Sequence, residues 1–147
     1  QGYGGLANWE EIARGVATAR ANQDKNNPQR TLILGNGDVQ SRSQGEKLAK
    51  QYGLDGVLIG RASFGNPYVF QDQLDKNRTG LAQIALEHAK VFEQTFANGG
   101  KYSFLPMRKH LGWYTKGLTK AKEIRLKLMQ TQTSEEVEQI FLSYQLI

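Results

Sequence analysis

Two short apolar segments, each preceded by an amphipathic segment, limit most strongly what the first half of the chain can fold into. Residues 31–34 ("TLIL") and 56–59 ("GVLI") are apolar and followed by glycine, which predicts two buried strands. Residues 9–21 and the segment that ends at Gly53 carry apolar side chains at helical spacing, which predicts a helix before each strand. Helix, strand, helix, strand is typical of parallel βα units, whose strands are covered on both faces.

Capping signals support the two predicted helices. Asn8 with Glu11, and Ser43 with Glu46, have the spacing of a capping box, in which a polar side chain accepts a backbone N–H of the first helical turn. Gly53 can adopt the left-handed backbone that ends a helix. The two helices are therefore predicted to begin after Asn8 and after Ser43.

The second half of the chain carries helical periodicity throughout. Four amphipathic helices are predicted, beginning after Thr79, near Phe104, after Thr119 and after Thr133. The first is expected to end at Gly99–Gly100 and to bury Leu81, Ile84, Ala85, Val91, Phe92 and Phe96. Thr133 and Glu136 form another capping box. Four such helices joined by short loops indicate a small bundle, and we expect a domain boundary between residues 76 and 77.

Positive charge is concentrated in the C-terminal third. The chain has a net charge of +5, and residues 101–127 hold eight lysine or arginine residues against one acid, Glu123. The rest of the chain holds 11 basic and 13 acidic residues, so the whole surplus lies in that segment. This asymmetry indicates a polyanionic partner.

Absent and rare residue types exclude several kinds of site. The 147 residues contain no cysteine, which excludes disulfides within them, and with only His88 and His110 no metal site is expected. No apolar run reaches the roughly 18 residues that a membrane helix needs, so no membrane association is expected. A reducing, cytoplasmic setting fits this composition. The chain opens with Gln1 and a glycine-rich stretch, and we expect it to be a piece of a longer protein.

Glycines and polar residues follow both predicted strands. Gly35–Asp38 ("GNGD") comes after the first strand, and Gly60 and Arg61 come after the second. Ligands of parallel βα folds bind at the carboxyl ends of the strands. Glycine lets backbone N–H groups approach an anion, and arginine presents a planar fork to phosphate oxygens. Each turn alone is more simply explained as an ordinary loop, with Asp38 capping the next helix, but the two together indicate a phosphate site.

Three stretches resemble the tRNA-dihydrouridine synthase family, in this order: "LILGNGDV" (32–39), "DGVLIGRASFGNPYVF" (55–70) and "MRKHLGWYTKG" (107–117). The opening "QGYGGLANWEEI" also resembles the family segment that follows the sixth barrel strand. The resemblance implies an α/β TIM-barrel fragment, the last βα units of an FMN-binding barrel, in residues 1–76. It also implies an all-α helical bundle that binds tRNA in residues 77–147.

The resemblance further implies where the cofactor binds. The family's FMN-binding positions near the phosphate match Asn36, Gly37, Asp38, Gly60 and Arg61, with Gly35 adjacent to them. In the family, NADPH reduces FMN, and the reduced flavin passes hydride to a uracil of tRNA while a cysteine protonates the neighbouring carbon. This chain lacks that cysteine and the rest of the barrel. No catalytic residue is therefore expected in it, and the fragment alone is expected to be inactive.

Basic side chains of the predicted bundle are the candidates for tRNA binding, which the charge distribution supports independently. They are Arg108, Lys109, Lys116, Lys120, Lys122 and Arg125. Lys109 and Lys116 are seven residues apart, which predicts one helical stripe, and Gly112 between them would let a phosphate backbone lie close. The alternative for the lysines is a solvated face. Each of the two arginines is either part of a structural ion pair or an RNA contact.

The two histidines receive structural interpretations. His88 falls on an apolar helical face and is expected to be a hydrogen-bonded core histidine. His110 shares a face with Trp113 and Tyr114, and for this trio core packing is favoured over stacking on an unpaired base.

Two other functions remain open from the sequence. A flavin oxidoreductase with a phosphate-binding barrel and a small-molecule substrate would explain the strand ends but not the basic bundle. A non-catalytic RNA-binding module would explain the lysines but not Gly35–Asp38 and Arg61.

Overall fold

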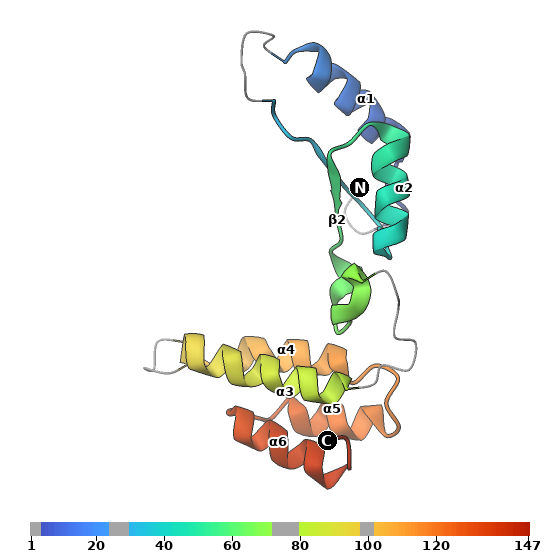
Figure 1. The fold of residues 1–147 in the computed structure, drawn as a ribbon. Coiled ribbons are helices and arrows are strands. Elements are labelled where there is room, and N and C mark those ends of the chain that lie inside the picture. Colours follow the sequence, from blue (N-terminus) through green and yellow to red (C-terminus); the bar gives the residue numbers. More distant parts are fainter. Residues whose placement is uncertain (1–3, 24–29, 72–79, 98–101) are drawn as a thin grey trace. The chain divides into compact units, whose positions relative to one another are not determined.

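The computed structural model of the chain describes residues 4–23, 30–71, 80–97 and 102–147 (Figure 1). The chain divides into two compact units, of which the first comprises Gln1–Ser63 and Pro67–Leu74 and the second Phe64–Asn66 and Asp75–Ile147. The boundary expected between residues 76 and 77 lies outside the described residues. In the described part of the chain, none of the helices is both long enough and apolar enough to cross a membrane.

The first unit alternates helix and strand, as its periodicity predicts. Its elements are α1 (Trp9–Ala21), β1 (Leu34–Asn36), α2 (Arg42–Tyr52) and β2 (Gly56–Leu58), followed by short 3₁₀ turns at Arg61–Ser63 and Pro67–Phe70. The two strands are parallel, with Leu34 opposite Gly56, Gly35 opposite Val57 and Asn36 opposite Leu58. The prediction of two parallel strands joined through a helix is confirmed.

The first strand lies three residues later than predicted. Residues 31–33 are outside the strand, and β1 begins at Leu34. The cause is Asp55, whose backbone N–H donates to the Ile33 carbonyl at 2.9 Å while its carboxylate accepts the Ile33 N–H at 2.7 Å. The hydrogen bond to the Asp55 side chain thus takes the place of a backbone hydrogen bond between the two strands. The hydrogen bond from Ile33, followed by that from Arg20, lowers the pKa of the Asp55 carboxyl.

Helix caps in the first unit are correct for α1 and displaced for α2. The Asn8 side chain accepts the N–H groups of Glu10 and Glu11, as predicted. The cap of α2 is Ser41, which accepts the Gln44 N–H at 3.2 Å, so the prediction of Ser43 is wrong by two residues. Ser41 and Gln44 have the same capping-box spacing, which leaves the sequence with two competing starts. Gly53 ends α2 with φ of 66°, as predicted.

In the described residues, the second unit is a bundle of four helices, as predicted. They are α3 (Leu81–Phe92), continued by a π-helical turn at Glu93–Ala97, then α4 (Leu105–Tyr114), α5 (Ala121–Leu128) and α6 (Ser134–Ser143). Helix α3 packs against α4 and α6, and α5 packs against the same two helices (Figure 1). The core between them is apolar and includes Leu86, Met107, Leu111, Ile124, Leu128, Val137 and Phe141. Burial of these side chains is the main source of stability for such short helices.

Several details of the bundle differ from the sequence prediction. Val91 and Phe96 are 53% and 47% exposed, because the buried face of α3 follows Leu81, Ala85 and Ala89. Helix α5 begins after Lys120, which provides no side-chain cap, so the predicted cap at Thr119 is wrong. The Thr133 cap of α6 is confirmed by its bond to the Glu136 N–H. The predicted cap at Thr79 and stop at Gly99–Gly100 lie outside the described residues.

Candidate cofactor and nucleic-acid sites

The carboxyl ends of β1 and β2 bring the two glycine-bearing turns together. Because Asn36 lies opposite Leu58 in a parallel pair, Gly37–Asp38 and Gly60–Arg61 leave the sheet at the same edge. The Arg61 guanidinium forms an ion pair with the Asp38 carboxylate across that edge. Neighbouring turns of this kind are what a phosphate site at a strand end requires.

Asp38 is held from two sides at this strand end. One oxygen of its carboxylate accepts the Ala7 N–H at 2.7 Å, and the other accepts a hydrogen bond from Arg61. Its φ of 53° is left-handed, a conformation that aspartate tolerates better than most residues. Asp38 therefore ties the segment before α1 to the turn after β2.

Close packing explains why Gly35 and Gly37 at the strand end lack a side chain, which the sequence alone did not show. A Cβ on Gly35 would lie 2.6 Å from Leu54 Cδ1 and 2.8 Å from the Trp9 ring. Gly37 has φ of 141°, and a Cβ there would overlap the Cβ of Ala7. The unit's own packing therefore requires both glycines.

Gly60 is different from the other glycines at this edge. A Cβ on Gly60 would meet no atom within 4 Å, and its φ is outside the left-handed range. Packing within the described chain does not explain why this position lacks a side chain. An open space beside the Gly60 backbone is the kind of space that a bound group would occupy.

The two lysines predicted to share a stripe of α4 do not share one. Lys109 lies on α4, with its Nζ 5.3 Å from the centre of the Trp113 ring. Lys116 lies beyond the end of the helix, where its N–H donates to the Trp113 carbonyl at 3.3 Å. The Thr115 hydroxyl donates to the Gly112 carbonyl. Hydrogen bonds such as these, between residues three positions apart, end the helix early. Both lysines are exposed, but the predicted stripe is wrong.

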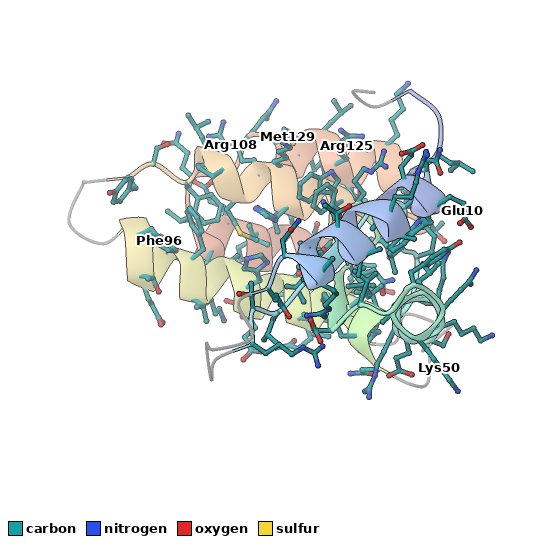
Figure 2. All side chains as sticks on the ribbon, turned by 90° about the horizontal axis from the view of Figure 1, so that it is seen from above. Glu10, Lys50, Phe96, Arg108, Arg125 and Met129 are labelled. Carbon is teal, nitrogen blue, oxygen red and sulfur yellow. The ribbon has the colours of Figure 1, made fainter. Side chains whose placement is uncertain are left out.

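Gly112 serves helix packing rather than an approach from solvent. It is buried, and a Cβ there would lie 3.4 Å from Arg125 Nε and 3.7 Å from Met129 Sδ. Figure 2 labels both of these side chains, which α5 and its C-terminal end contribute. The prediction that Gly112 opens α4 to a phosphate backbone is therefore wrong. The glycine lets the Arg125 side chain lie across α4.

Arg108 bonds to backbone carbonyls, a partner that neither of its two predicted roles included. Its Nε donates to the Thr131 carbonyl at 2.7 Å, and its second amino group donates to the Gln130 carbonyl at 3.4 Å. These carbonyls follow the C-terminal end of α5, where helix carbonyls lack partners within the helix. Arg108 therefore fastens α4 to the end of α5.

Replacing Arg108 with methionine is expected to destabilise the bundle by about 1.5–3 kcal/mol, the range for hydrogen bonds that involve a charged group. Methionine keeps the apolar stem but leaves the carbonyls of Gln130 and Thr131 without these donors. Urea unfolding would measure the change. The matched control is Arg14→Met, which removes an exposed arginine paired with Glu11 and should cost under about 0.5 kcal/mol. Equal losses in both variants would contradict the anchoring role.

The histidines form one aromatic cluster with Tyr114 and Trp113. His88 Nδ1 lies 3.2 Å from the Tyr114 hydroxyl, and the His88 and His110 rings are 5.2 Å apart. Burial lowers the pKa of both imidazoles, aided by His110 for His88 and by Lys109 for His110. The predicted hydrogen bond of His88 is confirmed, but the residue is half-buried and lies outside the apolar core. Of the trio for which core packing was favoured, Tyr114 packs against the apolar core, whereas His110 and Trp113 are half-buried and meet edge to face.

An additional contact of Trp113 was not foreseen from the sequence. The Phe64 ring stacks on the Trp113 ring with centres 4.0 Å apart and planes within 4°. Gly65 follows with φ of +63°, and a Cβ there would lie 2.5 Å from the Trp113 carbonyl carbon. These two residues thereby belong to the packing of the second unit.

The chain thus combines an α/β unit that carries polar residues at its strand ends with a basic helical bundle. The chain belongs to the dihydrouridine synthase family, whose model matches residues 1–146.

Curated relatives agree with this assignment. The chain is 32% identical over 143 residues to a probable tRNA-dihydrouridine synthase of Staphylococcus epidermidis, covering 95% of this chain and 41% of that protein. It is 32% identical over 108 residues to probable tRNA-dihydrouridine synthase 2 of Bacillus subtilis, covering 73% and 33%. A probable tRNA-dihydrouridine synthase of Staphylococcus aureus is 34% identical over 107 residues. The chain thus spans less than half the length of these relatives.

Proposed function

We propose that this chain is part of an FMN-dependent tRNA-dihydrouridine synthase, which uses NADPH to reduce a uridine of tRNA to dihydrouridine. Bound FMN would carry hydride from NADPH to the uracil ring. The observation that carries the proposal is the meeting of Gly37–Asp38 and Gly60–Arg61 at one sheet edge, in a chain of this family. The uridine would leave its stack to reach the flavin, as base-modifying enzymes require.

The first unit is proposed to be the last part of a TIM barrel, in residues 1–76. Its strands are parallel, and Leu34 and Leu58 are 52% and 49% exposed. The alternate residues of the strands point the other way, where Gly35 approaches Trp9 and Leu54. Parallel sheets are covered on both faces, and in a barrel the second face lines the filled interior. The exposed leucines support such an interior.

The residues at the strand end fit the phosphate of FMN. The backbone of Gly60 is open to an incoming group, and Arg61 supplies a planar fork for phosphate oxygens. A carboxylate repels phosphate, so the part of Asp38 is to hold Arg61 and the Ala7 N–H in place. Asn36 and Gly37 complete the proposed set. The sequence has no cysteine, so a cysteine general acid would come from outside these 147 residues.

The second unit is proposed to bind tRNA, within residues 77–147. The exposed basic residues Lys109, Lys116, Lys120, Lys122 and Arg125 would contact phosphates, and Arg108 would hold their scaffold together. Near absence of acids in residues 101–127 supports a polyanionic partner over a solvated lysine face.

An absorption spectrum of the whole protein tests the flavin part of the proposal. We expect visible flavin bands in the purified protein, and bleaching of these bands on adding NADPH without oxygen. Mass spectrometry of tRNA from cells that lack the protein should show loss of dihydrouridine. A colourless protein that FMN cannot reconstitute would refute the reductase.

The double change Lys109→Glu with Lys116→Glu is expected to weaken tRNA binding and to flatten its salt dependence. The logarithm of the affinity decreases linearly with the logarithm of the salt concentration. For each phosphate that the protein no longer neutralises, the magnitude of this slope decreases by about 1. Filter binding of a tRNA transcript at several salt concentrations would measure the slope. The matched control is Lys47→Glu with Lys50→Glu on α2, where the slope should stay unchanged. An unchanged slope in the first variant would remove these lysines from the interface.

A further inference from the structure

Two histidines meet between α3 and α4, and neither has a part in the proposed function. His88 lies on α3 and His110 on α4, with their ring centres 5.2 Å apart and the rings edge to face. His88 Nδ1 lies 3.2 Å from the Tyr114 hydroxyl, and the centre of the His110 ring lies 5.0 Å from that of Trp113. Both imidazoles are half-buried and belong to the packing between the two helices.

The groups that surround this pair are neutral or positive. Burial raises the pKa of the Tyr114 hydroxyl, so this group stays neutral at physiological pH and cannot compensate a charge on His88. Lys109 brings a positive charge close enough to lower the pKa of His110. The segment 64–66, which packs against the last turn of α4, carries no charged residue. A proton on either imidazole would therefore add positive charge to a place that holds no negative charge.

The carboxylates of the neighbouring helices are engaged elsewhere or exposed. Those with a partner are Glu138 with Lys90, Glu93 with Ser134, Glu136 with Gln132, and Glu123 with Tyr144. Glu87 precedes His88 on α3 but is exposed, and consecutive residues of a helix do not face each other. The basic side chains of α5 are exposed, and Arg108 of α4 bonds to carbonyls at the end of α5. Within the described ranges, no carboxylate forms an ion pair with His88 or His110.

Charge on the two imidazoles opposes the folded bundle. Burial lowers the pKa of both, and the second contribution comes from His110 for His88 and from Lys109 for His110. A proton on His88 need not break its contact with Tyr114, because the hydroxyl can accept a hydrogen bond, so the cost arises from burial and like charge. In the unfolded chain both imidazoles have the usual pKa of about 6.5. The folded protein therefore binds fewer protons than the unfolded chain as the pH falls through this value, and its stability falls with it.

The histidine pair also lies beside the residues that hold the segment 64–66. The Phe64 ring stacks on the Trp113 ring, which in turn contacts His110. The Gly65 backbone lies close to the Trp113 carbonyl, since a Cβ on Gly65 would be 2.3 Å from that oxygen. Any shift of α4 away from α3 would move Trp113 and thereby disturb both contacts.

We infer that the His88–His110 pair makes the joint between α3 and α4 acid-sensitive, and that acid also releases residues 64–66 from Trp113. At neutral pH the imidazoles are uncharged and pack against each other. In acid, two cations beside Lys109 repel each other and loosen the joint. The inference goes beyond the proposed function, because it depends on neither FMN nor tRNA.

The first experiment measures the titration of each histidine by NMR of the whole protein, labelled with carbon-13 in its histidine rings. His88→Gln and His110→Gln assign the two signals, and we expect both midpoints below about 6.5. The His88 midpoint should rise in His110→Gln, and the His110 midpoint should rise in Lys109→Met, because each change removes a neighbouring positive charge. Lys50→Met, which changes an exposed lysine of α2, is the matched control and should leave both midpoints unchanged.

The second experiment measures hydrogen exchange of the whole protein by mass spectrometry, on either side of the usual histidine value, at about pH 7.5 and about pH 5.5. Protection factors, which correct for the intrinsic pH dependence of exchange, should fall in acid for α3, α4 and residues 64–66. The fall can reach about tenfold per pH unit for each histidine. It should be absent from the double variant His88→Gln with His110→Gln, and peptides from α1 and α2 should keep their protection in both proteins.

Three outcomes would overturn the inference. Midpoints at or above about 6.5 for both histidines would show that the fold does not oppose their charge. An unchanged His110 midpoint in Lys109→Met, a change at an exposed side chain that folding does not oppose, would remove the like charge from the account. An equal loss of protection in the parent and in the double variant would assign the acid sensitivity to other groups. Loss in α3 and α4 alone, with residues 64–66 still protected, would overturn the release of that segment.

Discussion

Gly60→Ala is expected to weaken the proposed binding of FMN while leaving the thermal stability of the protein unchanged. The added Cβ meets no protein atom within 4 Å and no left-handed backbone, so folding does not oppose it. In the proposed FMN site, a methyl group in this space would instead occupy the place assigned to the phosphate. We expect flavin affinity to fall at least about tenfold, equal to about 1.4 kcal/mol. Fluorescence titration with FMN and a melting curve of the apoprotein would measure the two quantities.

Gly15→Ala is the control for this experiment. Gly15 lies on α1, where a Cβ also meets nothing within 4 Å, so alanine should raise stability by roughly 0.5–1 kcal/mol and leave flavin affinity unchanged. Full FMN binding by Gly60→Ala would exclude a phosphate beside that backbone. Loss of both flavin and stability would mean that Gly60 is a folding residue.

Gly65→Ala is expected to destabilise the helical unit by about 3 kcal/mol or more. The residue has φ of +63°, which costs an L-residue about 1–2 kcal/mol, and its Cβ would overlap the backbone carbonyl of Trp113. Because backbone cannot swing aside as a flexible side chain does, α4 or the segment beside it would have to shift. Urea unfolding followed by tryptophan fluorescence would measure the loss.

Gly80→Ala separates the two causes. Gly80 has φ of +73° but a Cβ there meets nothing within 4 Å, so alanine should cost only the backbone part, about 1–2 kcal/mol. Equal losses at positions 65 and 80 would show that the overlap with Trp113 contributes nothing.

Local patterns predicted the elements of this fold because their causes are local. The apolar spacing of Ile124, Leu128, Val137 and Phe141 marks helices that bury one face, and all four side chains are buried. The cap at Asn8 depends on bonds to residues two and three positions later. The start of β1 could not be predicted, because the Asp55 carboxylate that replaces a ladder bond lies 22 residues from Ile33.

The candidate sites were predictable only in part. Parallel pairing alone brings Gly37–Asp38 beside Gly60–Arg61, so the strand pattern was sufficient to join them. The ion pair of Asp38 with Arg61 needed the structure, since either side chain could have faced solvent. On the bundle, charge counting found the basic residues but not their surroundings. It could not show that Gly112 faces Arg125, because helix periodicity does not say which neighbour a face meets.

The packing of Phe64 and Gly65 on Trp113 limits how modular this protein can be. Residues 64–66 belong to the second unit although residues 67–74, which follow them, belong to the first. A chimera that joins the α/β half of one relative to the helical half of another at the position of residue 77 would pair Trp113 with a foreign partner segment. Recombination between relatives should therefore succeed only when residues 64–66 travel with the helices, so the unit that can be exchanged is discontinuous in the gene.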